Sequence, residues 1–154
     1  MPMPYDIVVE TVPAELVAAV RAHVPIGGIA KAWKPALDQV WAYLKVNDGL
    51  RPGHNLFLYH HPDRRDEAMD IDFGVQVSRP FEREGEVRCI ETPAGEVART
   101  VHIGPYDRLG DAHHAIHAWC ASNGRKIARA SWEVYGDWNN DPALLETTIR
   151  YLLA

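Results

Sequence analysis

The stretch AMDIDFGVQVS at residues 68–78 is the clearest indication of the fold class, because hydrophobic and polar residues alternate along it. Successive side chains of a β-strand point to opposite faces, so this alternation predicts a strand with one buried face and one polar face. The side chains expected on the buried face are Met69, Ile71, Phe73, Val75 and Val77. Before it, residues 55–61 (NLFLYHH) and a Pro62-Asp63 turn predict another strand.

Outward from these strands, the first half of the chain has the order strand, strand, helix, strand, strand. Residues 6–12 are rich in β-branched side chains, which favour a strand. Residues 15–24 fit a strand or a helix, and the flanking Pro13 and Pro25 favour the strand. Residues 33–46 carry hydrophobic side chains at helical spacing and predict the helix.

The second half of the chain repeats this order. Strands are expected at residues 86–91, 96–103, 127–136 and 145–153, and a helix at residues 108–122. Two such ββαββ half-repeats, about residues 5–79 and 85–153, predict one α+β domain over residues 1–154. The expected fold is an eight-stranded antiparallel sheet with both helices on one face. The strand faces opposite the helices are then expected to line a ligand cleft between the halves.

Alternation also assigns residues near the C-terminus to faces. Trp132 and Val134 share one face of their strand, and Glu133 and Tyr135 share the other. If Trp132 packs beneath the helix, Glu133 points into the predicted cleft. The same pattern turns Asp72 away from the helix-covered face of its own strand.

Composition and charge exclude several classes of protein. The net charge is −5 and no block of lysine or arginine occurs, whereas direct nucleic-acid binding needs a basic stripe. No stretch approaches the roughly 20 apolar residues of a membrane-spanning helix. The N-terminus has neither the basic start nor the apolar run of a signal peptide. We therefore expect a cytoplasmic protein without membrane contact, in which Cys89 and Cys120 are reduced thiols.

The eight histidines raise the question of a metal site. His113 and His117 stand four residues apart on the predicted helix, but no glutamate follows His113 in an HExxH pattern. The His60-His61 pair has no partner that the sequence identifies. We therefore expect no metal. Gly27-Gly28 is not followed by phosphate-loop residues, and no cofactor is expected.

Several motifs resemble the GyrI-like, AraC-type effector-binding family. The C-terminal ones are WEVY at residues 132–135, DP at 141–142 and ETTIRYL at 146–152. HIGPYDRL at residues 102–109 looks like the strand-to-helix junction of the family's second half, and DFGVQV at residues 72–77 looks like its first-half counterpart. Together the motifs cover nearly the whole chain in the order that this family shows.

The resemblance implies two SHS2-like halves about a pseudo-two-fold axis, with a ligand cleft between them. The glutamate of the family's E-x-Y motif meets cationic drugs in multidrug-sensing members, and Glu133 matches it here. Some free-standing relatives are associated instead with hydrolysis of cyclopropane-containing electrophiles, and others bind DNA gyrase. Transcriptional members carry a helix-turn-helix segment before this module. This sequence shows no such segment, so a direct regulator role is not expected.

A glutamate in an aromatic cleft has two chemical uses. When ionised, Glu133 offers a cation a counter-charge, and each aromatic face adds about 0.5–2 kcal/mol. When burial raises its proton affinity, it serves as a general base or a nucleophile. Tyr135 lies about 6–7 Å away along the same strand face, where its phenol can donate to a ligand oxygen or to the carboxylate. The sequence leaves both uses open.

The sequence therefore predicts a ligand site centred on Glu133. Further expected ligand contacts are Tyr135, Trp138, Tyr106, Tyr59, Phe57 and Asp72. The favoured function is capture of a small cationic or amphipathic organic molecule. The alternative is a hydrolase of electrophilic small molecules, with Glu133 as base or nucleophile and Tyr135 assisting. A third hypothesis is a protein partner, such as DNA gyrase, bound by the acidic outer surface.

Overall fold

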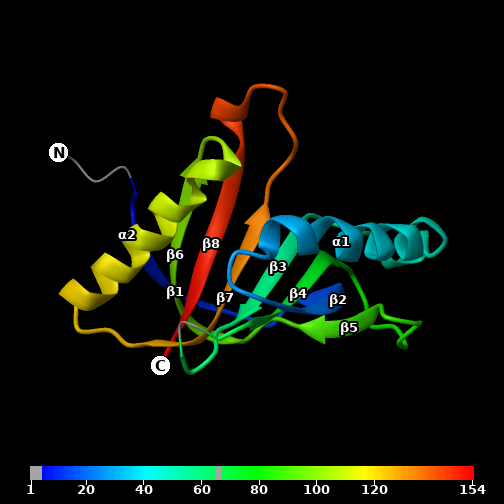
Figure 1. Ribbon diagram of the computed structural model, residues 1–154, viewed down its shortest axis with the longest axis horizontal. Coiled ribbons are helices and arrows are strands. Elements are labelled where there is room, and N and C mark those ends of the chain that lie inside the picture. The colour runs from blue at the N-terminus through cyan, green and yellow to red at the C-terminus, as the bar shows by residue number, and fades with distance from the viewer. Residues whose placement is uncertain (1–4, 65–66) are drawn as a thin grey trace. The chain divides into compact units, whose positions relative to one another are not determined.

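A computed structural model describes residues 5–64 and 67–154 of the chain. It contains eight strands and two α-helices in these residues, which confirms the predicted α+β class (Figure 1). The helices are α1 (Ile29–Lys45) and α2 (Leu109–Ser122). In the same residues, neither helix combines the length and the apolar character that crossing a membrane requires.

The chain forms two compact units, which we name after their helices. The α1 unit is Ala14–Pro93, and the α2 unit joins the N-terminal strand to Ala94–Ala154. Cys89 lies in the α1 unit and Cys120 in the α2 unit; both are free thiols, of which Cys120 is buried and Cys89 only half-buried.

The α1 unit is an antiparallel sheet in the order β3-β4-β2-β5. Its strands are β2 (Leu16–Val24), β3 (Asn55–His60), β4 (Met69–Gln76) and β5 (Arg88–Glu91), and a 3-10 turn, η1 (Asp48–Leu50), follows α1. β2 pairs with β4 on one side and with β5 on the other, so the strand assignment of residues 15–24 is confirmed.

The helix-facing side of this sheet carries the hydrophobic residues predicted from the alternation. Ile71, Phe73 and Val75 are each 0% exposed, and Phe57 meets Phe73 edge to face with ring centroids 4.8 Å apart. α1 begins at Ile29, four residues before the predicted start. Its first turn is largely exposed, so hydrophobic spacing carried no signal there.

The α2 unit is an antiparallel sheet in the order β1-β6-β8-β7. Its elements are β1 (Val8–Val12), β6 (Gly95–Ile103), η2 (Tyr106–Arg108), α2, β7 (Ile127–Tyr135), η3 (Pro142–Leu144) and β8 (Glu146–Leu153). α2 packs on the sheet through a core that includes Ala112 and Ile116 from the helix and Ala98, Ile149 and Tyr151 from the strands.

Each sheet takes one edge strand from the opposite half of the sequence. β1 pairs with β6, with Val8 opposite Arg99, and β5 pairs with β2, with Leu16 opposite Glu91. The predicted order of elements in each half is confirmed, but the sheets do not coincide with half-repeats of residues 5–79 and 85–153. Alternation shows which face of a strand is buried and carries no information on which strand pairs with it. The cleft between the halves stays a prediction.

Candidate functional site

Glu133 lies on the face of its sheet that α2 covers. It is paired with Ile149 of β8, and directly paired residues share a face. Ile149 belongs to the same core cluster as Ile116 of α2. Trp132, which is 1% exposed, is therefore on the other face. The condition under which Glu133 would point into the predicted cleft, with Trp132 beneath the helix, is therefore not met. Alternation pairs the residues of a face and does not tell which face the helix covers.

The Glu133 carboxylate is buried and receives hydrogen bonds on both of its oxygens. The residue is 4% exposed. The phenol of Tyr135 donates to Oε1 at 2.5 Å, and Nε2 of His113 lies 2.6 Å from Oε2. The predicted partnership of Glu133 and Tyr135 on one strand face is thus present as a direct hydrogen bond.

His113 links this carboxylate to a second phenol. Its Nδ1 lies 2.6 Å from the hydroxyl of Tyr151 on β8. Burial, and secondly the negative charge of Glu133, raises the pKa of Tyr151, so this phenol keeps its proton. With a neutral imidazole, Tyr151 donates to Nδ1 and Nε2–H donates to Glu133. The result is a continuous series of hydrogen bonds from Tyr151 through His113 to Glu133. We call these three residues, together with Tyr135, the Glu133 relay.

One more predicted residue lies beside the relay. Tyr106, in η2 at the entry to α2, meets the ring of Tyr135 edge to face with centroids 5.5 Å apart. Burial raises the pKa of the Tyr106 phenol. Trp138, by contrast, is 72% exposed in the loop after β7, and its indole N–H donates to Oδ1 of Asn140 at 3.2 Å. Tyr106 is therefore close to the relay, and Trp138 presents its ring to solvent.

Phe57 and Tyr59 lie in the α1 unit, on the face of β3 that α1 covers. Phe57 is 7% exposed, and Trp33 of α1 lies over it with ring centroids 6.4 Å apart. Tyr59 is 9% exposed. Both side chains are largely part of the core of their unit.

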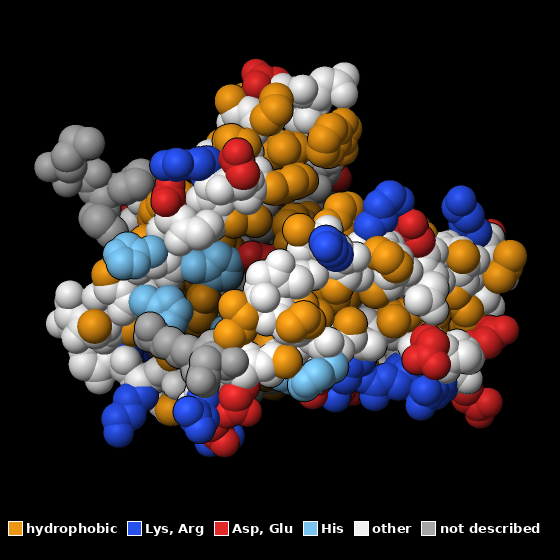
Figure 2. Space-filling view, viewed as in Figure 1, with side chains coloured by type: hydrophobic (Ala, Val, Ile, Leu, Met, Phe, Trp, Pro, Cys, Tyr) orange, Lys and Arg blue, Asp and Glu red, His pale blue; other side chains and the backbone are white. Residues whose placement is uncertain are grey.

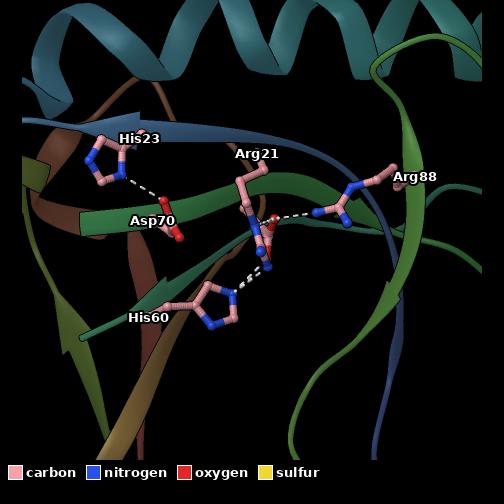
Figure 3. A network of polar contacts seen from close by, with 6 residues as sticks. Arg21, His23, His60, Asp70 and Arg88 are labelled. Carbon is pink, nitrogen blue, oxygen red and sulfur yellow. Dashed lines mark hydrogen bonds and ion pairs between the residues drawn. The ribbon is translucent and has the colours of Figure 1, made fainter. Parts of the chain in front are cut away.

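Asp72, the last predicted contact, is the centre of a separate polar network. Arg21 donates to both of its oxygens, at 3.0 and 2.9 Å, and Nε2 of His60 lies 2.7 Å from Oδ2. Arg88 lies 3.4 Å from Oδ1. Figure 3 shows Arg21, His60 and Arg88 converging on the far side of the sheet from α1. The predicted orientation of Asp72 away from the helix is confirmed.

This network keeps Asp72 ionised although it is 1% exposed. Burial by itself raises the pKa of a carboxyl group, but the hydrogen bonds from His60 and Arg21 outweigh that effect and hold the Asp72 pKa below its ordinary value. Asp72 lies opposite Leu58 on β3, whereas Phe57 lies opposite Phe73. Asp72 and Phe57 therefore face opposite sides of one sheet.

A groove of about 580 Å³ lies on another part of the α2 unit. Its lining includes Tyr5, His102, Pro105, Arg108, Asp111 and His114. His102 is 3% exposed and engages Tyr5 and the Pro105 carbonyl, at 2.8 and 2.9 Å. The groove does not include Glu133 or Tyr135 in its lining. The carboxylate in this groove, Asp111, is exposed and paired with Arg108 at 2.9 Å, whereas that of Glu133 is buried. We therefore place the candidate site at the Glu133 relay.

His113 is the functional residue that sequence reasoning missed. From the sequence, His113 is considered only as a metal ligand, and it is one of several histidines whose side chains gather over α2 (Figure 2). One signal was present: His113 precedes the buried Ile116 by three residues, which puts it beside the inward face of the helix. Within residues 5–64 and 67–154, no group of three or more His, Cys, Asp or Glu side chains is placed to hold a metal ion.

Comparison with protein families gives one match over nearly the whole chain. A model described as the GyrI-like small molecule binding domain matches residues 5–152. The comparison with curated proteins finds no match.

Solved structures share the fold. The C-terminal domain of EcmrR is 26% identical, with a TM-score of 0.81 and 99% of each chain covered. EcmrR in its complex with DNA gives the same identity and TM-score, and this chain spans 58% of its length. SAV2435 bound to tetraphenylphosphonium is 10% identical, with a TM-score of 0.68 over 97% of this chain and 94% of that one. A hydrolase encoded by lin2189 from Listeria innocua is 13% identical, with a TM-score of 0.65 over 96% and 91%. The last two likenesses show the fold alone.

Proposed function

This chain belongs to the GyrI-like small molecule binding domain family, and we propose that it binds a small organic cation with Glu133 as the buried counter-charge. The observation that carries the proposal is a carboxylate that is 4% exposed and bordered by phenol rings. At an effective dielectric constant of about 20, a cation about 4 Å from a carboxylate gains about 4 kcal/mol. Each aromatic face adds about 0.5–2 kcal/mol.

The hydrogen bonds of the relay support this role. Tyr135 and His113 hold the two oxygens of Glu133 from different directions, at 2.5 and 2.6 Å. The carboxylate is thereby ordered before a ligand arrives, which lowers the entropy cost of binding. Tyr106 extends the aromatic border beyond Tyr135. Ligand contacts from Phe57, Tyr59, Trp138 and Asp72 stay predictions.

Calorimetric titration with tetraphenylphosphonium tests the proposal, since this lipophilic cation is the molecule bound to SAV2435. Glu133→Gln keeps the shape of the side chain and removes its charge, and we expect it to weaken binding by about 1–3 kcal/mol, or roughly 5- to 150-fold. The matched control is Glu146→Gln, at an exposed position of the same unit. Equal affinities of the two variants, with both folded by circular dichroism, would remove Glu133 as the counter-charge.

A hydrolase is the second candidate, and the donors around Glu133 favour it. In this mechanism Glu133 takes a proton from water while the water oxygen bonds to a carbon of a strained, carbonyl-activated ring. One ring C–C bond breaks, and its electron pair moves to the carbonyl as an enolate, which then recovers the proton from Glu133. Tyr135 or His113 donates a hydrogen bond to the oxygen that gains charge.

Turnover separates the two candidates. Incubation with a cyclopropyl ketone electrophile, followed by mass spectrometry, detects a product heavier by one water. A hydrolase forms this product in the wild-type protein and loses it in Glu133→Gln, whereas a binding module forms none in either protein. Equal product formation in both proteins would take Glu133 out of the mechanism.

A further inference from the structure

We propose that His113 determines the charge of the ligand that this site accepts: with a neutral imidazole the site takes organic cations, and with a protonated imidazole it takes neutral molecules of similar shape. This inference rests on the proposed function and adds a pH-dependent selectivity to it. Its structural basis is the position of the imidazole directly against the counter-charge, 2.6 Å from Oε2 of Glu133.

The two side chains differ in their access to solvent. The side chain of His113 is 23% exposed, whereas that of Glu133 is 5% exposed. A proton from solvent therefore reaches the imidazole while the carboxylate stays buried. Imidazole is the side chain whose charge ordinarily changes between about pH 5 and pH 8. The imidazole is thus the member of this pair that solvent can reach, and it lies directly against the buried carboxylate.

The hydrogen bonds of His113 allow both charge states. In the neutral state Tyr151 donates to Nδ1 and Nε2–H donates to Glu133, so the pair carries a net charge of about −1. In the protonated state both ring nitrogens donate, Tyr151 accepts at its oxygen, and the pair is neutral. A cation then meets a fixed positive charge beside the carboxylate, whereas with a neutral imidazole it meets the net negative charge of the pair.

The groups around His113 come from three elements. They are Glu133 and Tyr135 on β7, Tyr151 on β8, and His114 and His117 on α2 itself. His117 contacts the Tyr151 ring edge to face at 5.0 Å, and Asp111 is paired with Arg108 at 2.9 Å. Glu133 is therefore the charge that His113 meets directly, and His117 is the second imidazole whose protonation the experiment must separate from that of His113.

Calorimetry with tetraphenylphosphonium on the full chain tests the inference. An ordinary imidazole is protonated below about pH 6.5. As the pH falls through this range, we expect the dissociation constant for the cation to rise by up to about tenfold for each pH unit. By reciprocity, cation binding in this range must release up to about one proton per site. Titrations in two buffers with different ionisation enthalpies measure that proton on the wild-type protein.

Three variants locate the titrating group. His113→Gln retains an N–H donor and cannot become charged, so we expect cation affinity that no longer varies with pH and no released proton. His114→Gln and His117→Gln are the matched controls on the same helix, and both are expected to keep the wild-type pH profile. Triphenylphosphine oxide is the neutral probe, and its affinity is expected to stay level or rise as the pH falls.

The outcomes distinguish the two proposals. Absence of cation binding at every pH would overturn the proposed function itself. Cation binding with the same pH dependence in wild type and His113→Gln would overturn the role of His113 and leave the function standing. Loss of the pH dependence in His117→Gln would assign the selectivity to His117 instead of His113. This result would also overturn the inference.

Discussion

The hydroxyl of Tyr135 donates a 2.5 Å hydrogen bond to Oε1 of Glu133, which precedes it by two residues on the same face of β7. A strand brings residues i and i+2 to one face, so the E-x-Y spacing in the sequence is sufficient to place a donor beside the carboxylate. The first prediction follows from this pair.

Tyr135→Phe removes the donor and keeps the ring that meets Tyr106. Hydrogen bonds to charged groups contribute about 1.5–3 kcal/mol, and Tyr135 is half-buried, so water replaces part of the bond. We expect a loss of about 1–2 kcal/mol in the free energy of unfolding, measured by urea denaturation. Tyr106→Phe, at a more exposed phenol, is the control with an expected change below about 0.5 kcal/mol. Equal effects of the two changes would argue against the Glu133 bond as a stabilising contact.

Asp72→Asn removes the charge at the centre of the second polar network. Breaking a buried ion pair costs about 3–5 kcal/mol, and we discount this to about 2–4 kcal/mol because the side chains of Arg21 and Arg88 are 41% and 32% exposed. The control is Asp70→Asn, whose carboxylate pairs with an exposed His23 at 2.8 Å and is expected to contribute less than about 1 kcal/mol.

The same network predicts the direction of acid sensitivity. The Asp72 pKa is lowered in the folded state, so its contribution is present above the ordinary carboxyl pKa of about 3.9 and is lost as the pH falls through the lowered value. The stability difference between wild type and Asp72→Asn is therefore expected to shrink between about pH 5 and pH 2. A difference that grows over this range in thermal or urea unfolding would contradict the assignment.

Two buried threonines are expected to respond in opposite directions when each is replaced by valine, because only one of the two hydroxyls has a hydrogen-bond partner in the described residues. Thr147 is 0% exposed, and in the described part of the chain its hydroxyl has no hydrogen-bond partner. Thr100 is 1% exposed and donates to the Asp6 carbonyl at 2.9 Å. We expect Thr147→Val to be neutral or stabilising by up to about 1 kcal/mol, and Thr100→Val to cost about 1–2 kcal/mol. Thermal denaturation of both variants checks the pair, and a reversed order would contradict it.

Gly74 in β4 has no room for a methyl group. A Cβ at this position would lie 2.5 Å from the Ala18 carbonyl oxygen and from a methyl carbon of Val17. We expect Gly74→Ala to destabilise the protein by about 1–3 kcal/mol or more, since backbone must shift to relieve the contact. Gly110→Ala is the control, because no atom lies within 4 Å of its Cβ and alanine favours helix by about 0.5–1 kcal/mol. Urea midpoints that move in the same direction would contradict this contrast.

Local sequence patterns predicted most of the fold. All eight strands and both helices fall within a few residues of their expected ranges, because alternation, helical spacing and flanking proline or glycine are properties of neighbouring residues. The helix-covered face of β7 could not be assigned from the sequence, and Trp132 is buried on the side away from α2. A large hydrophobic side chain identifies a buried face, and both faces of this strand carry buried residues.

Only the part of the candidate site that lies on a single strand could be predicted from the sequence. Glu133 and Tyr135 share β7, so their contact follows from spacing. His113 arrives from α2 and Tyr151 from β8, and their meeting depends on how the helix packs on the sheet. Among the eight histidines, the signal that could select His113 from the sequence was its position three residues before the hydrophobic Ile116.

The reciprocal placement of β1 and β5 suggests a route by which such a fold evolves. It also determines what two fragments of the chain would need from each other. Each strand completes the sheet that the other half of the chain builds, β1 on β6 and β5 on β2. A polypeptide of half this length would lack one edge strand, and a second copy could supply it by mutual exchange, as in a swapped homodimer. Gene duplication would then convert that dimer into one continuous chain. Scission between Arg79 and Gly85 would reverse the step, yielding two fragments that each require the other for a complete sheet.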